Sequence, residues 1–270
     1  MIELAQVEER LALFAEGIAG RYHHIKPSSE FSSRRLQLAA NETALTRDTL
    51  FLPERLPTTD PAAYRVLALQ QLCHREFGSF RFSLAHARSR VQALAARDPP
   101  DTRVRLSDFQ LFYQHFSRPA LASRLFNLAE RARVDALMLE QYPGIERHLT
   151  RYRGLQLTLA PPELITSLSL LLHGLDCHLL GAPREHLLSL DETGAMAQML
   201  AILTKVQQTP TDVYQSVSAC CALYEACADL QEGTAASIDL PLEEELDAPA
   251  NWLQREGRLE DWRDDLAALE

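Results

Sequence analysis

The stretch TTDPAAYRVLALQQLCHREFGSF, residues 58–80, carries the start and stop signals of a helix. Asp60 is a residue type that caps the first turn, and Pro61 suits the first helical position because its missing N–H would have no partner there. Gly78 suits the position after the last turn, because glycine adopts left-handed backbone angles readily. The sequence therefore predicts a helix that begins at Pro61 and ends before Gly78.

Patterns of the same kind recur along the chain. Apolar residues at helical spacing, several with Pro, Asp or Thr near their start, predict further helices within residues 1–18, 85–97, 106–116, 118–144, 160–180, 191–208 and 209–233. Residues 21–56 are rich in Ser, Thr and Pro and predict a long connection with one or two short strands. SFRFSL, residues 79–84, predicts a brief strand or an extended link. The expected fold class is mainly α, a multi-helix domain with at most a few short strands.

Composition and charge exclude some classes of function. The 270-residue chain is 46% hydrophobic with a formal net charge of -10, so it can bury a large core and lacks the basic excess of a nucleic-acid binder. Its N-terminus is acidic where an export signal is basic. The most apolar window, residues 164–180, is interrupted by His173, Asp176 and His178. We therefore expect no nucleic-acid partner and no membrane association, with a buried helix in that window.

The cysteines are scattered and contain no C-x-x-C pair; they are Cys73, Cys177, Cys220, Cys221 and Cys227. An odd, scattered set favours reduced thiols over a disulfide framework, and reduced thiols are typical of the cytoplasm. Small residues around the last three favour close helix packing over a reactive or metal site. The sequence therefore predicts a cytoplasmic protein with mostly buried thiols.

The charge changes near the C-terminus. Residues 237–270 hold eleven Asp or Glu against three Arg, so this segment alone has a net charge of -8. Such a composition favours a solvated linker over a packed domain. We predict a helical domain over residues 1–236 and an acidic linker over residues 237–270.

Gln70, Gln71 and His74 fall where a zinc-peptidase helix of the H-E-x-x-H type carries its functional residues. In that motif two His four residues apart bind the metal, and the Glu between them activates a water. Gln70 stands in the place of the first ligand and Gln71 in the place of the base, and an amide performs neither role near neutral pH. From these residues alone, ordinary helix packing is the better interpretation.

A wider set of residues resembles a known family. The set comprises Tyr64-Arg65, His74 with Phe77-Gly78-Ser79-Phe80, and Glu130-x-x-Arg133-Val134 in a helix that runs into Tyr142-Pro143-Gly144. Over residues 21–149 the chain resembles the N-terminal region of the CbbO/NorD family, the von Willebrand A domain adaptors that partner MoxR-type AAA+ ATPases. The CbbO rubisco-activase subunit is the preferred relative, and the NorD-type activator of nitric oxide reductase is the alternative.

The resemblance implies an adaptor subunit rather than an enzyme. It implies a hexameric MoxR-type ATPase as partner, rubisco as the preferred client and no cofactor in this chain. It also implies a C-terminal von Willebrand A domain beyond the acidic linker, whose D-x-S-x-S motif does not occur in these 270 residues.

The resemblance further implies a degenerate zincin-like helix pair. Its vestigial positions are Gln70, Gln71, His74 and Glu130, with His74 facing Glu130 and no metal bound. The acidic pair expected on the second helix reads Glu130-Arg131 here. The rival hypothesis is a metal-dependent hydrolase that uses His74, Glu130 and a third ligand.

Histidines and glycines give two more predictions. His23-His24 has no acidic or Cys partner at a ligand spacing, which predicts a surface loop. Neither common Gly-rich phosphate loop occurs, so ATP hydrolysis is assigned to the partner.

Overall fold

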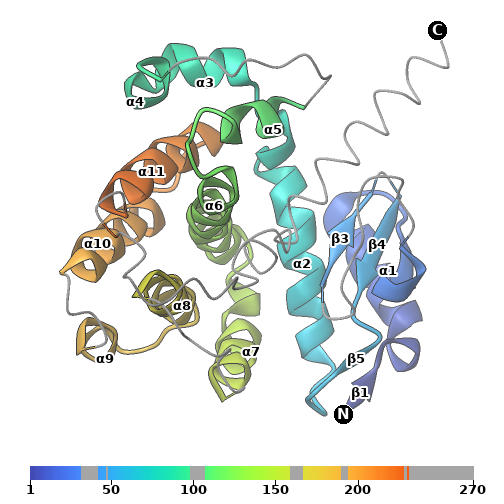
Figure 1. Ribbon diagram of the computed structural model, residues 1–270. Helices are drawn as coiled ribbons and strands as arrows, with labels where there is room; N and C mark the ends of the chain where they lie inside the picture. Colours follow the sequence, from blue (N-terminus) through green and yellow to red (C-terminus); the bar gives the residue numbers. More distant parts are fainter. Residues whose placement is uncertain are drawn as a thin grey trace, which may run out of the picture.

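Helices dominate the part of the chain that the computed structural model describes, which is residues 1–31, 42–46, 48–97, 107–158, 167–189, 194–227 and 230 (Figure 1). The α-helices of this part are α1 Glu8–Ala19, α2 Ala62–Glu76, α3 Leu84–Arg90, α4 Gln92–Ala95, α5 Asp108–Tyr113, α6 Pro119–Gln141, α7 Glu146–Thr158, α8 Ser167–Leu179, α9 Arg184–Ser189, α10 Ala195–Gln208 and α11 Val213–Ala226. Its strands are β1 Ile2–Glu3, β2 His24–Pro27, β3 Ala44–Leu45, β4 Thr49–Leu52 and β5 Arg55–Leu56. Its 3₁₀ turns are η1 Leu4–Gln6, η2 Ser28–Glu30, η3 Ser79–Arg81 and η4 Pro143–Ile145. The prediction of a mainly α fold is confirmed.

The longest of these helices, α6, lies at the centre of the bundle (Figure 1). It packs against α11, α10, α8 and α2, and Pro119 occupies its first turn as expected for a residue without an N–H. An aromatic cluster joins α6 to α5 and to Phe82, the residue after η3. Phe82 is stacked on Phe109 at 4.2 Å, and Phe126 is edge-on to Phe112 at 5.6 Å, both between ring centroids. These contacts make α6 the main buried element of the bundle.

Helix α2 separates this bundle from a smaller layer formed by α1 and the strands (Figure 1). One face of α2 packs on α6 and α7 through Val66, Leu69 and Cys73, and the other packs on α1 and the strands through Tyr64 and Leu72. Two apolar faces explain why eleven of its fifteen residues are buried.

The predicted end of α2 before Gly78 is confirmed, and its start lies one residue later than predicted, at Ala62. Asp60 Oδ1 accepts the N–H of Ala62 at 2.9 Å, and Gly78 follows the helix with a φ of +76°. The cap satisfies an N–H that the first turn leaves without a helical partner, and the left-handed glycine lets the chain reverse direction.

The strands form two small sheets. One has the order β2-β4-β3, with β2 parallel to β4 (Ile25 beside Leu50) and β3 antiparallel to it. The other pairs β1 with β5 in antiparallel register, with Ile2 beside Leu56. One or two strands were expected in residues 21–56, and four lie there among the described residues; β3 and β5 are only two residues long, too short for a pattern in the sequence to show.

Three other expectations about elements need correction. Residues 2–6 form β1 and η1, so the first helix begins at Glu8 rather than near Met1. In residues 79–84, where a brief strand or an extended link was expected, residues 79–81 form a 3₁₀ turn and Leu84 begins α3. Helices α7 and α9 were not predicted, since both are largely polar, with one buried residue each.

The apolar window at residues 164–180 contains α8, whose leucines Leu168, Leu171, Leu172, Leu175 and Leu179 are buried. The prediction of a buried helix is confirmed there. Within the described ranges, no helix combines the length and apolar character that crossing a bilayer requires. The predicted acidic linker, residues 237–270, lies outside the described residues.

Candidate functional site

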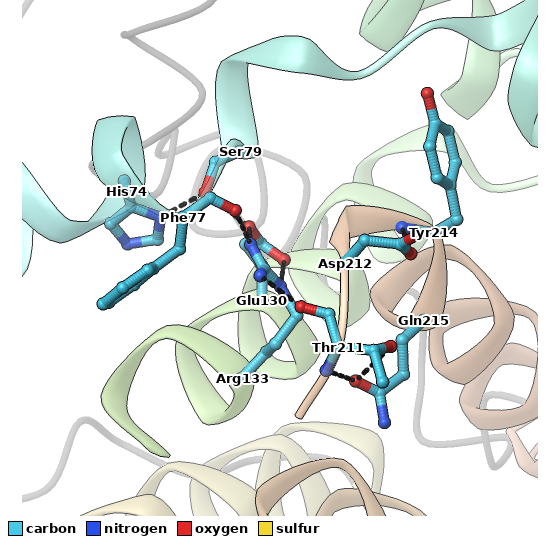
Figure 2. A network of polar contacts seen from close by, with 9 residues as sticks. All are labelled: His74, Phe77, Ser79, Glu130, Arg133, Thr211, Asp212, Tyr214 and Gln215. Atoms are coloured by element: carbon cyan, nitrogen blue, oxygen red, sulfur yellow. Dashed lines mark hydrogen bonds and ion pairs between the residues drawn. The ribbon is translucent and has the colours of Figure 1, made fainter. Parts of the chain in front are cut away.

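Two of the predicted site residues, His74 on α2 and Glu130 on α6, lie in one buried network (Figure 2). The Ser79 hydroxyl joins them, 3.0 Å from His74 Nδ1 and donating to Glu130 Oε1 at 2.5 Å. The expected pair is therefore a chain of three side chains. Ser79 is the member that analysis of the sequence missed as a site residue.

Gln70 and Gln71 make their hydrogen bonds to residues outside the network that holds Glu130. Gln70 Nε2 donates to Asp135 Oδ1 at 2.9 Å, and Gln71 Nε2 donates to Thr43 Oγ1 at 2.5 Å. Among the described residues, no three His, Cys, Asp or Glu side chains are grouped as metal ligands would be. The four vestigial positions thus do not fit a zinc site, which needs three converging protein ligands.

The centre of the network is an ion pair within α6. Glu130 and Arg133 are both fully buried, with Arg133 Nε donating to Glu130 Oε2 at 2.9 Å and Nη2 donating to Oε1 at 2.5 Å. Arg133 also donates from Nη1 to the Thr211 carbonyl at 3.1 Å and from Nη2 to the Phe77 carbonyl at 3.2 Å. One guanidinium therefore ties α6 to the end of α2 and to the connection between α10 and α11 (Figure 2).

Burial determines what this ion pair contributes. Taking two charges out of water costs several kcal/mol per ion, and their attraction offsets that only when the geometry is good and the other polar atoms are satisfied. The two-pronged Arg133–Glu130 contact has that geometry, and Ser79 and two carbonyls supply the additional bonds. The pair therefore fixes the relative position of three elements more than it adds net stability.

The local backbone explains why these partners converge. Helix α2 ends at Glu76, which leaves the Phe77 carbonyl outside the helical ladder. Gly78 then turns the chain at a positive φ that a side chain with a Cβ adopts only under strain, and this turn brings the buried Ser79 to α6. On the other side, Asp212 caps α11, and the carbonyl of the preceding residue faces Arg133.

The network is poorly suited to catalysis. Both Glu130 oxygens already accept hydrogen bonds, and a general base needs a lone pair directed at its substrate. The neighbouring thiol, Cys73, is buried, and burial raises its pKa far above the usual value, so it stays protonated and unreactive. The geometry instead suits a structural junction.

The prediction of a surface loop is wrong for His23. Its ring is fully buried, 3.0 Å from the Arg21 carbonyl through Nδ1 and 2.8 Å from Arg75 Nη1 through Nε2. Because a carbonyl only accepts and a guanidinium only donates, the neutral ring carries its proton on Nδ1. Burial lowers the pKa of His23, and the Arg75 charge lowers it further. His24 is exposed on β2.

The cysteines match the prediction of mostly buried free thiols. Four are buried, and Cys177 is half-buried. Burial raises the pKa of Cys221 and of Cys227 to about 11. Thiols with such pKa values are packing residues rather than nucleophiles.

An open groove of about 490 Å³ lies directly outside the network. It runs between the end of α2 with η3 and the start of α11, and its lining residues are Glu76, Phe77, Gly78, Arg81, Leu137, Thr211, Asp212, Val213 and Tyr214. Phe77 and Thr211 belong to both the groove and the network, because their carbonyls accept from Arg133. The buried ion pair thus holds the two walls of the groove together.

Comparison of the chain with known protein families, with curated proteins and with solved structures finds no match. The geometry above and the sequence resemblance therefore carry the functional proposal.

Proposed function

We propose that this chain is the non-catalytic N-terminal domain of an adaptor that couples a hexameric MoxR-type AAA+ ATPase to a client enzyme. Rubisco is the client that we favour, activated by remodelling and release of inhibitory sugar phosphates. Nitric oxide reductase is the alternative client. In this division of labour the helical domain contacts the motor, and a von Willebrand A domain beyond the acidic linker holds the client.

The observation that carries the proposal is the contact between the two segments that bear the sequence resemblance. Residues 74–80 end α2 and residues 130–134 lie in α6, yet Ser79 bonds to Glu130 and Arg133 bonds to the Phe77 carbonyl. Motif residues that are distant in sequence and form one buried junction are what a shared structural core would produce. This contact supports the resemblance, which was drawn from the sequence alone.

The side-chain directions support an adaptor over the rival hydrolase. Gln70 and Gln71 bond to Asp135 and Thr43, and Glu130 is occupied by Arg133. A hydrolase would need these positions to converge on one metal and one water. A docking domain needs only a stable scaffold with a suitable surface.

The test is co-purification of the chain with the cognate hexameric ring, followed by an ATPase assay. We expect the chain to elute with the ring and to change its rate of ATP hydrolysis. A His74→Gln variant separates the two hypotheses, because the adaptor proposal expects unchanged ring binding and the hydrolase hypothesis expects lost hydrolytic activity. If the chain neither binds the ring nor competes with a full-length adaptor, while an isolated von Willebrand A domain does both, the proposal is wrong.

A further inference from the structure

Helices α3 and α4 form an outer segment of the bundle, residues 84–95, which packs against α5 and α11 (Figure 1). We call these residues the α3–α4 segment. Helix α3 has seven residues and α4 has four, and isolated helices of such lengths are unstable in water. The buried side chains of the segment are Ala87, Val91 and Leu94. With so few buried contacts, the segment belongs to the part of the fold that opens most readily.

Polar contacts also hold the α3–α4 segment in place. Arg90 pairs with Asp212 at 2.6 Å, and the two side chains are 55% and 46% exposed, so water and salt weaken this pair. The N–H of Leu84 donates to Asp108 Oδ2 at 3.1 Å, which caps α3. A third contact, between Arg88 and a buried histidine, differs from these because it depends on the protonation of its partner.

That histidine is His115, which follows α5 and is engaged at both ring nitrogens. Its Nδ1 lies 2.8 Å from the Leu111 carbonyl oxygen, and its Nε2 lies 3.0 Å from Arg88 Nη1. Because a carbonyl only accepts and a guanidinium only donates, the ring is neutral and carries its proton on Nδ1. A second proton on Nε2 would face the N–H of Arg88, so two donors would oppose each other. The observed contact therefore fits the neutral ring.

The charges around His115 also favour the neutral ring. Burial lowers its pKa, and the charges of Arg88 on α3 and of Arg97 after α4 lower it further, while its bonds to backbone carbonyls oppose the shift. From α11, Glu225 pairs with Arg97 at 3.6 Å and is 63% exposed, so water weakens its compensating charge. A proton added to the ring in the closed segment therefore meets two cations and little solvent.

We propose that the α3–α4 segment is a pH-sensitive element that opens locally when His115 takes up a second proton. In the open segment water solvates both the ring and Arg88, so the repulsion between them is relieved. Opening also removes Arg90 from Asp212 and from the Tyr214 ring, over which its guanidinium lies at 4.9 Å. Because Asp212 and Tyr214 line the groove, the groove surface changes with the segment. This inference goes beyond the proposed function and does not depend on it.

The direction and size of the effect follow from proton linkage. In the open segment the His115 ring has the ordinary histidine pKa of about 6.5, and in the closed segment its pKa is lower. The stability of the closed segment is therefore complete above about pH 6.5 and falls as the pH drops below it. At pH 5.5 the ring in the open segment is protonated about ten times more often than it is neutral. The opening equilibrium therefore rises by up to about tenfold relative to pH 8.

Amide hydrogen exchange of the full chain at pH 8 and pH 5.5 tests the proposal, with protection factors that correct for the intrinsic pH dependence of exchange. We expect the amides of α3 and α4 to be less protected than those of α6 at both pH values, and their protection to fall severalfold at pH 5.5, up to about tenfold. Equal protection in α3, α4 and α6 would show that the segment opens only with global unfolding. That result, or a fall of less than about twofold, would overturn the proposal.

Three variants identify the responsible ring. We expect His115→Gln, which does not titrate, to abolish the pH dependence in α3 and α4. Arg88→Gln should reduce it, because the amide oxygen accepts from a protonated ring, and since Arg88 is half-buried this variant tests the proposal even if His115→Gln is too unstable to fold. His86→Gln is the control, an exposed histidine of α3 whose replacement should leave the dependence unchanged. A pH dependence that persists in His115→Gln, or that is unchanged in Arg88→Gln, would assign it to another group and contradict the proposal.

Discussion

Two acid–arginine clusters on α6 use the same chemical groups in opposite environments. The inner pair, Glu130 and Arg133, has no exposed side-chain surface. The outer cluster consists of Arg124, Arg131, Asp135, Arg153 and Asp176, and its arginines keep 19–34% of their side-chain surface exposed. The outer cluster joins α6 to α8 through Asp176 and to α7 through Arg153.

The difference between them teaches how burial changes the role of an ion pair. Water and salt screen the contacts of Asp176, whose side chain is 23% exposed, so those contacts are weak and replaceable. The inner pair has no water to replace a lost partner, and its arginine also holds two backbone carbonyls. The inner pair therefore fixes the positions of α6, the end of α2 and the α10–α11 connection relative to one another. The Asp176 contacts of the outer cluster add only weak attraction between α6 and α8.

The largest expected effect comes from breaking the inner pair with Glu130→Gln. The variant keeps the size of the side chain but leaves the Arg133 charge buried without a counter-charge. We expect it to lower the free energy of unfolding by about 3–5 kcal/mol, measured by urea denaturation.

A double variant provides the control for that measurement. Glu130→Leu combined with Arg133→Met removes both charges, and we expect it to be less destabilised than Glu130→Gln although it changes more atoms. If Glu130→Gln lowered the free energy of unfolding by less than about 1 kcal/mol, the inner pair would be no stronger than an exposed ion pair, and the two clusters would not differ.

The elements around the inner pair show how far prediction from the sequence reaches. The ends of α2 were predictable because Asp60, Pro61 and Gly78 act locally on the backbone. The long helix over residues 119–141 was predictable because its apolar spacing persists over many turns.

The roles of Ser79 and His23 were not predictable, because each depends on a partner distant in sequence. Ser79 bonds to a residue 51 positions away, and His23 bonds to one 52 positions away. No local pattern distinguishes these residues from a loop serine or a surface histidine. The strands were under-predicted because two-residue strands are defined only by their pairing, which a short run of sequence does not show.

The second expected effect comes from Ser79→Ala, which sharpens the comparison by removing one neutral contact of the inner pair. Glu130 then loses a hydrogen bond to its charged oxygen, and we expect a loss of about 1–3 kcal/mol in the free energy of unfolding. Ser216→Ala is the matched control. Its hydroxyl is equally buried but has no hydrogen-bond partner among the described residues, so its removal should be neutral or slightly stabilising. Equal losses in the two variants would contradict a role for the Ser79 bridge.

The third expected effect concerns arginines that face histidines instead of carboxylates. Arg75 donates to His23 Nε2, and Arg88 lies 3.0 Å from His115 Nε2. Burial lowers the pKa of both rings, and the neighbouring arginines lower it further, while hydrogen bonds to backbone carbonyls oppose the shift. Since the unfolded chain binds these protons more readily, stability should be complete above about pH 6.5 and fall as the pH drops below it.

Urea midpoints measured between pH 8 and pH 5 test this dependence. We expect His23→Gln to flatten the curve and the exposed His24→Gln to leave it unchanged. A curve that is flat in the unaltered protein between pH 7 and pH 5 would contradict the assignment of neutral rings.

The smallest expected effect comes from Asp176→Asn in the outer cluster. The substitution removes the contacts with Arg124 and Arg131, but water solvates both arginines in its place. We expect a loss of at most about 1 kcal/mol in the free energy of unfolding. Raising NaCl to about 1 M shortens the Debye length to about 3 Å, so the loss should shrink further, whereas the loss in Glu130→Gln should persist because salt does not reach the buried site. If Asp176→Asn proved as costly as Glu130→Gln, or if salt weakened both losses equally, burial would not be what separates the two clusters.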